Sequence, residues 1–165
     1  MQPVSPAINR SKRMTKTSEG RIEAEECPVA RTLEVLGDRW SLMIIRDAFD
    51  GISRFGEFRN NLGLAKNILA SRLRDLVEHG ILMIVPASDG SAYHEYVLTD
   101  KGRQLFPIVV SLRQWGEDHL FAAGEKHSIL VENQSGHPIS KLTVSSQQGK
   151  VLDASECHRE KVIKR

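Results

Sequence analysis

Residues 54–98 read RFGEFRNNLGLAKNILASRLRDLVEHGILMIVPASDGSAYHEYVL. The first part of this stretch predicts a short helix, because apolar residues recur at i, i+3 and i+7 between 55 and 62. Ser53, just before the stretch, could cap this helix. Gly63 ends this helix and opens a tight turn. The spacing of apolar residues after the turn predicts an amphipathic helix at 66–79.

The rest of the stretch predicts a hairpin. Two β-prone runs, 81–87 and 93–98, flank the turn sequence Ser-Asp-Gly-Ser at 88–91. Two helices joined by a tight turn and followed by a hairpin are typical of a winged helix-turn-helix. In that fold one helix enters a DNA groove and the hairpin lies on the adjacent backbone.

The helix predicted at 66–79 has two unlike faces. One side collects the apolar residues Ile68, Leu69, Leu73 and Leu76, and the other collects the small and polar residues Asn67, Ala70, Ser71, Arg74 and Glu78. Short side chains let a helix sink into the major groove, where an amide or a guanidinium can make paired hydrogen bonds to base edges. We therefore expect Asn67, Ser71 and Arg74 to read bases. Lys66, at the helix N-terminus, is expected to hold a phosphate.

Charge is unevenly distributed over this stretch. From Arg54 to Arg74 there are five basic residues and one acidic residue, whereas 75–100 has five acidic residues and no lysine or arginine. The hairpin is therefore expected to contribute little to phosphate binding. Arg72 lies nearer the buried side of its helix, which leaves open an internal ion pair or a phosphate contact. The residues predicted to contact DNA are Arg54, Lys66, Asn67, Ser71, Arg72, Arg74, Ser91 and His94.

Three further helices are expected around this stretch. One begins at Cys27 and ends before Gly37, and a nearly apolar one runs from about 38 to 49. The last is expected at 100–121, kinked at Pro107 because proline removes a backbone hydrogen bond. Its apolar residues cover roughly 220° of the circumference, about twice what packing on one core needs. The surplus favours a homodimer, although burial against another part of the same chain would also explain it.

The predicted organisation has three parts. Residues 1–22 form a basic arm without apolar periodicity, which we expect to be disordered. Residues 23–122 form the winged helix-turn-helix domain, and residues 123–165 form an extension in which a small hairpin or meander is expected. Its strand-like runs are 129–131, 142–144 and 151–152. The fold class is therefore α+β, mostly α, with a long C-terminal dimerisation helix and a small β tail.

Bulk properties limit the function classes. The chain has 165 residues, 40% of them hydrophobic and 27% charged, and a formal net charge of +2, which suits one globular domain of ordinary size with tails. No apolar run is long enough to span a membrane, so a cytoplasmic protein is expected. Two cysteines far apart predict free thiols. Without a phosphate loop, a nucleophile and base pair or a cluster of metal ligands, we expect no enzyme, no metal and no cofactor.

Several short motifs occur in a fixed order: Cys27-Pro28-Val29, Gly37-Asp38-Arg39-Trp40, Arg54-Phe55-Gly56-Glu57-Phe58, Leu69-Ala70-Ser71-Arg72-Leu73, Tyr96-Val97-Leu98-Thr99 with Lys101-Gly102, and Trp115-Gly116. Together they make residues 25–121 resemble the HxlR-type regulators of bacteria, a MarR-like winged helix-turn-helix group. The resemblance implies a homodimer that binds pseudo-palindromic double-stranded DNA and represses or activates nearby genes. It also implies that the first and last helices build the dimer, so the expected interface comprises Val29, Leu33, Ile108, Val109, Leu112, Trp115 and Leu120.

The chain departs from the family pattern in three places. Many members have Ser-Pro at the start of the recognition helix, where this chain has Ala65-Lys66. Many members also have basic residues in the hairpin, where this chain has none. The operator sequence therefore does not carry over. Some members have cysteine pairs after the last helix, but 134–148 contains none, so zinc binding is not expected there.

Cys27 is expected at the start of the first helix, where the helix dipole stabilises a thiolate. In several family members a cysteine at this place senses oxidants or electrophiles, whereas many others share the Cys-Pro start without a redox role. Cys27 is thus a redox-sensing candidate, and a small molecule is the other candidate effector. The leading hypothesis is a homodimeric, DNA-binding transcriptional regulator that acts on an inverted repeat. The alternative is a winged helix that binds only other proteins.

Overall fold

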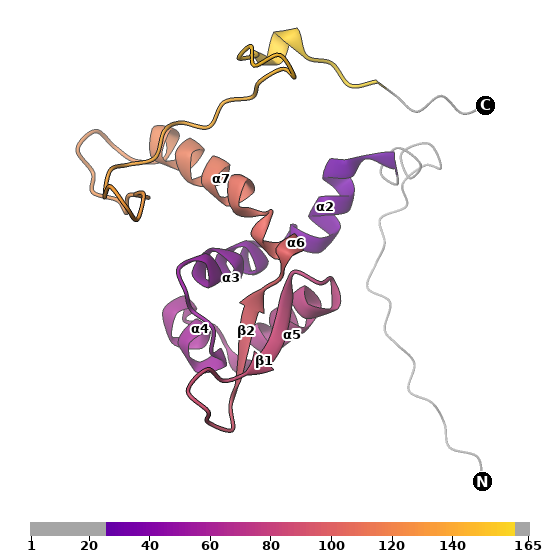
Figure 1. Ribbon diagram of the computed structural model, residues 1–165, viewed down its shortest axis with the longest axis vertical. Helices are drawn as coiled ribbons and strands as arrows, with labels where there is room; N and C mark the ends of the chain where they lie inside the picture. Colours follow the sequence, from indigo (N-terminus) through magenta and orange to yellow (C-terminus); the bar gives the residue numbers. More distant parts are fainter. Residues whose placement is uncertain (1–25, 161–165) are drawn as a thin grey trace, which may run out of the picture.

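The computed structural model describes residues 26–160, so the basic arm predicted at 1–22 lies outside the described residues. A helical body carries a hairpin at one end, and two helices with an extended C-terminal segment at the other (Figure 1). The elements in chain order are α2 Pro28–Leu36, α3 Arg39–Phe49, α4 Phe55–Leu62, α5 Lys66–Glu78, β1 Leu82–Pro86, β2 His94–Leu98, α6 Asp100–Arg103, α7 Phe106–His119 and the short 3-10 helix η1 Ala154–Glu156. This order confirms the predicted class, α+β and mostly helical.

The helix-turn-helix is formed by α4, the turn at 63–65 and α5. Gly63 ends α4 with a φ of 63°, a left-handed conformation that only glycine adopts without steric cost. At the start of α4 the structure corrects the prediction, because Arg54 and not Ser53 is the capping residue. The carboxylate of Glu57 accepts the backbone N–H of Arg54 at 3.0 Å, so the first turn is closed by an acid within the helix.

One apolar core joins α3, α4, α5 and the hairpin. Its fully buried members include Ile44 and Ile45 from α3, Phe58 from α4, Leu69, Leu73 and Leu76 from α5, and Leu82 from β1. The three leucines of α5 recur every three or four residues, so they lie on one side of the helix. α5 therefore packs against the core with that side, and its opposite side faces solvent.

The two strands of the hairpin pair antiparallel along their whole length, so that Pro86 lies opposite His94. The hairpin is also tied to the helix-turn-helix, because the N–H of Tyr96 donates to the carbonyl of Ser53 at 2.8 Å. This bond sets the hairpin beside the start of α4.

The C-terminal helix differs from the prediction of one kinked helix at 100–121. The structure has two helices, α6 and α7, separated at 104–105. Pro107 lies in the first turn of α7, where its missing N–H needs no partner. Inside a longer helix its ring would clash with the carbonyl of Arg103, so the chain ends one helix and begins another.

The extension after α7 contains two short turns in place of a sheet. Each is closed by one isolated antiparallel bridge, Val131 with Pro138 and Ser145 with Val151. Neither bridge continues into a strand ladder. The division of the chain at residues 22 and 122 stays a prediction.

Candidate nucleic-acid interface

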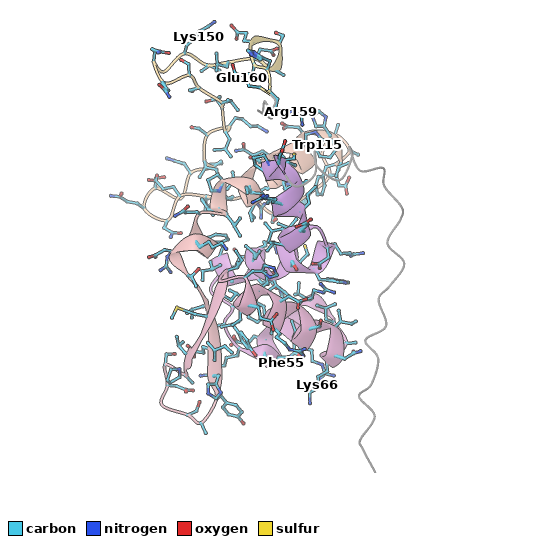
Figure 2. All side chains as sticks on the ribbon, turned by 90° about the vertical axis from the view of Figure 1, so that its right-hand side faces the viewer. Phe55, Lys66, Trp115, Lys150, Arg159 and Glu160 are labelled. Atoms are coloured by element: carbon cyan, nitrogen blue, oxygen red, sulfur yellow. The ribbon has the colours of Figure 1, made fainter. Side chains whose placement is uncertain are left out.

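Helix α5 presents its polar side to solvent at the end of the molecule that carries the hairpin (Figure 1). Lys66, Asn67 and Arg74 are exposed, and Ser71 is half-buried. Within the described part of the chain, none of these four side chains makes a hydrogen bond or an ion pair. Figure 2 shows Lys66 at the opposite end of the molecule from Trp115. These side chains are accessible to an external ligand and are not committed to internal partners.

The start of α5 is open as well. Its capping residue, Ala65, offers no side-chain hydrogen bond, so the first N–H groups of the helix can meet an anion such as a phosphate. Periodicity places Ile68 on the core side, but the structure leaves it 39% exposed because Leu69 fills the core at this turn. The buried stripe of α5 is therefore narrower than predicted.

Arg72 makes the internal ion pairs that the sequence left open as one alternative. Its Nη1 lies 3.2 Å from Oδ2 of Asp75 and 3.6 Å from Oδ2 of Asp38. Asp38 caps α3 by accepting the backbone N–H groups of Trp40 and Ser41. Burial would raise the pKa of Asp38, but the hydrogen bonds from Ser41 and the charge of Arg72 lower it overall. Arg72 therefore connects α5 to the start of α3.

A buried carboxylate of α3 is hydrogen-bonded to α4. Asp47 is fully buried and accepts from Nδ2 of Asn61 at 2.7 Å and from Nε of Arg46 at 2.9 Å. A buried charge of this kind is stable only when it is paired and hydrogen-bonded. The contact with Asn61 holds the end of α4, just before the turn that leads into α5, against α3.

Arg54 closes a cluster at the turn end of the hairpin. Its Nη2 lies 2.7 Å from Oδ2 of Asp89 and 3.4 Å from Oε1 of Glu95. Glu95 is buried and also accepts the N–H and the hydroxyl of Ser88 at 3.2 and 2.9 Å. We call Arg54, Ser88, Asp89 and Glu95 the hairpin clamp. The predicted role of Arg54 in DNA binding did not include these two acids, because nothing in the sequence indicates which charges meet across a turn.

The other two hairpin residues predicted to contact DNA, Ser91 and His94, differ in their exposure to solvent. His94 is exposed at the start of β2. Ser91 is half-buried, and its backbone N–H donates to Oδ1 of Asp89 at 3.0 Å. Of these two, His94 is the side chain that an approaching phosphate can reach.

We expect the hairpin clamp to weaken as the pH falls. Hydrogen bonds from Ser88 lower the pKa of Glu95, and the hydrogen bond from Arg54 lowers the pKa of Asp89. A carboxylate whose pKa is lower in the folded state stabilises the fold above its unfolded pKa, and this stabilisation is lost as the pH falls through the folded value. In an NMR titration, Arg54→Met should raise the pKa of Asp89. The matched variant Arg103→Met, which removes an exposed ion pair elsewhere, should leave it unchanged. Equal titration of Asp89 in both variants would rule the clamp out.

The apolar residues predicted for a dimer lie at the other end of the molecule. Six of the seven are exposed: Val29 and Leu33 of α2, Ile108, Leu112 and Trp115 of α7, and Leu120 just after it. Val109 is half-buried and packs against the core. Between α3 and α7 there is also an apolar pocket of about 290 Å³, lined by residues such as Leu42, Met43 and Leu112.

Cys27 precedes the first turn of α2 and is half-buried. The backbone N–H of Ala30 is the main cause that lowers the pKa of its thiol, and burial opposes the shift. The N–H of Val29 and the guanidinium of Arg159 lower the pKa further. Arg159 comes from the C-terminal extension, and Figure 2 places it at the same end of the molecule as Trp115. Arg159 has no role predicted from the sequence, since no local pattern connects it with residue 27.

Residues 26–160 contain neither a cluster of metal ligands nor a helix that could span a membrane. No three side chains of histidine, cysteine, aspartate or glutamate come together there in a way that could hold a metal ion. None of the helices in this part of the chain has both the length and the apolar character needed to cross a bilayer.

A helix-turn-helix with an uncommitted polar face on its second helix, followed by a hairpin, is the geometry of a DNA-binding domain. The model of the HxlR-like helix-turn-helix family matches residues 35–123. The chain belongs to the HxlR-like helix-turn-helix family. The HxlR-like region therefore runs from the end of α2 to just beyond α7, and the extension lies outside it.

Relatives of this HxlR-like chain are named as transcriptional regulators. It is 49% identical over 100 residues to the uncharacterized HTH-type transcriptional regulator Rv3095 of Mycobacterium tuberculosis; the match covers 61% of this chain and 62% of the relative, so the chain spans less than two thirds of that protein. Among solved structures it is similar to PA1607, described as a candidate transcription factor, with a TM-score of 0.80, 54% identity and coverage of 86% of this chain and 99% of the other. It is also similar to the redox regulator HypR in its reduced form, with a TM-score of 0.53, 35% identity and coverage of 57% and 94%.

Proposed function

We propose that this HxlR-like protein is a transcriptional regulator that binds an inverted repeat in double-stranded DNA as a homodimer. The observation that carries the proposal is the exposed side of α5, where Lys66, Asn67 and Arg74 have no partner among the described residues. Asn67 and Arg74 supply the amide and guanidinium groups that pair with base edges, and Lys66 supplies a phosphate contact. Arg54 and Arg72, which hold acids of this chain, act mainly by positioning the hairpin and α5.

The exposed apolar residues of α2 and α7 support the homodimer. A contiguous apolar surface is unfavourable in water, and symmetric pairing is the commonest way to cover it. Pairing through the end opposite to α5 leaves both recognition helices free. Two such helices related by a twofold axis read half-sites about one helical turn apart. A cytoplasmic location is part of the same proposal.

Footprinting of genomic fragments selected by the purified protein tests this proposal. We expect protection of an inverted repeat with half-sites about 10 base pairs apart. The affinity should fall at least roughly 1000-fold between 50 and 200 mM salt, because each phosphate contact releases counterions. A fragment of equal length with scrambled half-sites is the control. Binding that ignores salt, or that does not distinguish the two fragments, would favour a winged helix that binds only proteins.

We further propose that oxidation or electrophilic modification of Cys27 regulates DNA binding. The support is the lowered pKa of its thiol and its position on α2, beside the proposed dimer surface. A thiolate reacts faster than a thiol with oxidants and quinones. A modification at this place can change the angle between the two recognition helices.

We expect Cys27→Ser to bind operator DNA like the unmodified protein and to resist release by diamide or a quinone. Cys157→Ser, which changes the exposed second thiol, is the matched control and should be released normally. In addition, Arg159→Met should slow the reaction of Cys27 with iodoacetamide at pH 7, because the thiol pKa rises. Release of Cys27→Ser at the normal oxidant concentration would contradict the proposal.

A further inference from the structure

The extension after α7 carries apolar side chains that the described chain leaves largely uncovered. Val144 is 69% exposed and Leu142 is 48% exposed. The full set is Ile129, Val131, Leu142, Val144 and Val151. Short turns with isolated bridges are only marginally stable in water by themselves, so an ordered segment of this kind needs a surface to pack against.

The path of the extension is set by α7. Gln114 of α7 is buried; its Nε2 donates to the carbonyl of Ser140 at 3.0 Å and its Oε1 accepts the N–H of Leu142 at 2.8 Å. Between these two residues, Lys141 forms an ion pair with Asp118 of α7 at 2.5 Å. The amide of Gln114 therefore acts like the edge of a strand and holds residues 140–142 along the helix.

Part of the extension is matched in a related structure. The match with PA1607 covers 86% of this chain and 99% of the other. Residues 1–122 make up only about 74% of the chain, so the match includes part of the extension. The extension is thus a structural element shared beyond the HxlR-like region.

The charge of the extension indicates what kind of surface covers it. Between 125 and 160 there are four basic and five acidic residues, which does not suit a polyanion such as DNA. A neutral segment with exposed branched apolar residues suits an apolar protein surface.

Such a surface exists on this chain itself. Val29 of α2 and Trp115 and Leu120 at the end of α7 are each more than half exposed. Figure 1 shows α2, α7 and the extension together at the end away from the hairpin. Gln114, which anchors Leu142, is buried on α7, and the next residue, Trp115, is 59% exposed. The anchored part of the extension therefore lies along the same stretch of α7 that carries this exposed apolar side chain.

We propose that the extension clasps a second copy of this chain, with Leu142, Val144 and Val151 packing on the apolar surface at the same end of that copy. The proposal rests on the homodimer of the proposed function and adds residues outside the HxlR-like region to its interface. Each copy then covers part of the other, and the short turns of the extension gain the support they lack in one chain.

The test measures the dimer dissociation constant of the full chain by sedimentation velocity. The double variant Leu142→Asp with Val144→Asp should raise this constant about 100-fold, because two charges enter an apolar contact. Thr143→Asp with Ser145→Asp is the matched control. It adds the same charge to the intervening residues, whose side chains point the other way in extended chain, and it should stay within about threefold of the unmodified protein.

The outcomes separate the clasp from the dimer. If the unmodified protein is dimeric and both double variants dimerise equally well, or are weakened equally, the clasp is wrong while the homodimer stands. If the unmodified protein is monomeric at concentrations that saturate the operator, the homodimer itself fails. Hydrogen exchange gives a second measure that needs no variant: amides of 142–152 should exchange more slowly above the dimer dissociation constant than below it. Exchange independent of concentration would show that another protein, or none, covers the extension.

Discussion

Arg74→Glu is expected to lower the affinity of the protein for its operator at least about 100-fold at 100 mM salt. Arg74 is exposed on α5 and makes no ion pair within residues 26–160, so the change does not disturb the fold. A guanidinium contact to a base or a phosphate contributes about 1–3 kcal/mol. A homodimer loses the contact twice, and 1.4 kcal/mol per site already amounts to about 100-fold.

Lys126→Glu is the matched control for this change. It alters the net charge equally, and Lys126 lies in the segment that follows α7, remote in sequence and structure from α5. Binding should fall only slightly, through the general charge of the protein. Fluorescence anisotropy with a labelled operator measures both variants. Equal losses in the two would mean that α5 does not face the DNA.

Gly102→Ala is expected to lower the free energy of unfolding by about 3 kcal/mol. A Cβ at this position would lie 2.2 Å from the carbonyl oxygen of Ile81 and 3.1 Å from Cδ2 of Leu98. Neither the backbone of residue 81 nor the packed end of β2 can move away cheaply. The displaced α6 would also shift α7, which follows it directly.

The control for this variant is Gly56→Ala in α4. A Cβ on Gly56 meets no atom within 4 Å, so alanine should stabilise the helix by up to about 1 kcal/mol. Denaturation by urea compares the two variants with the unmodified protein. Similar unfolding midpoints for both would contradict the close approach of α6 to the hairpin.

Much of the helix-turn-helix could be predicted from local sequence. The boundaries of α3, α4 and α5 agree with the predicted ranges within one or two residues, because Asp38 and Gly63 act on their own neighbours in the chain. The hairpin was also expected from its turn sequence, but the connection between the strands spans residues 87–93 and is longer than the predicted turn at 88–91. In contrast, the break between α6 and α7 was predicted only as a kink, since the sequence shows that Pro107 interrupts a helix but not how far the chain must unwind.

The functional surface could be predicted only in part. Periodicity places Asn67, Ser71 and Arg74 on the side of α5 away from the core, and the structure leaves that side open. Periodicity gives no information on Arg54, because its two acids come from beyond a turn, at residues 89 and 95. The same holds for Gln114, whose partners are backbone groups of the extension.

The sequence by itself determined which segments of this protein are helical and which side of each helix is apolar, because both depend on interactions between residues a few positions apart. Only the tertiary structure decided which cations remain available for DNA. Ion pairs form between side chains that folding brings within about 4 Å, whatever their separation in sequence. Of the basic residues first assigned to DNA, Arg54 and Arg72 are held by acids of the same chain, while Lys66 and Arg74 remain open on α5.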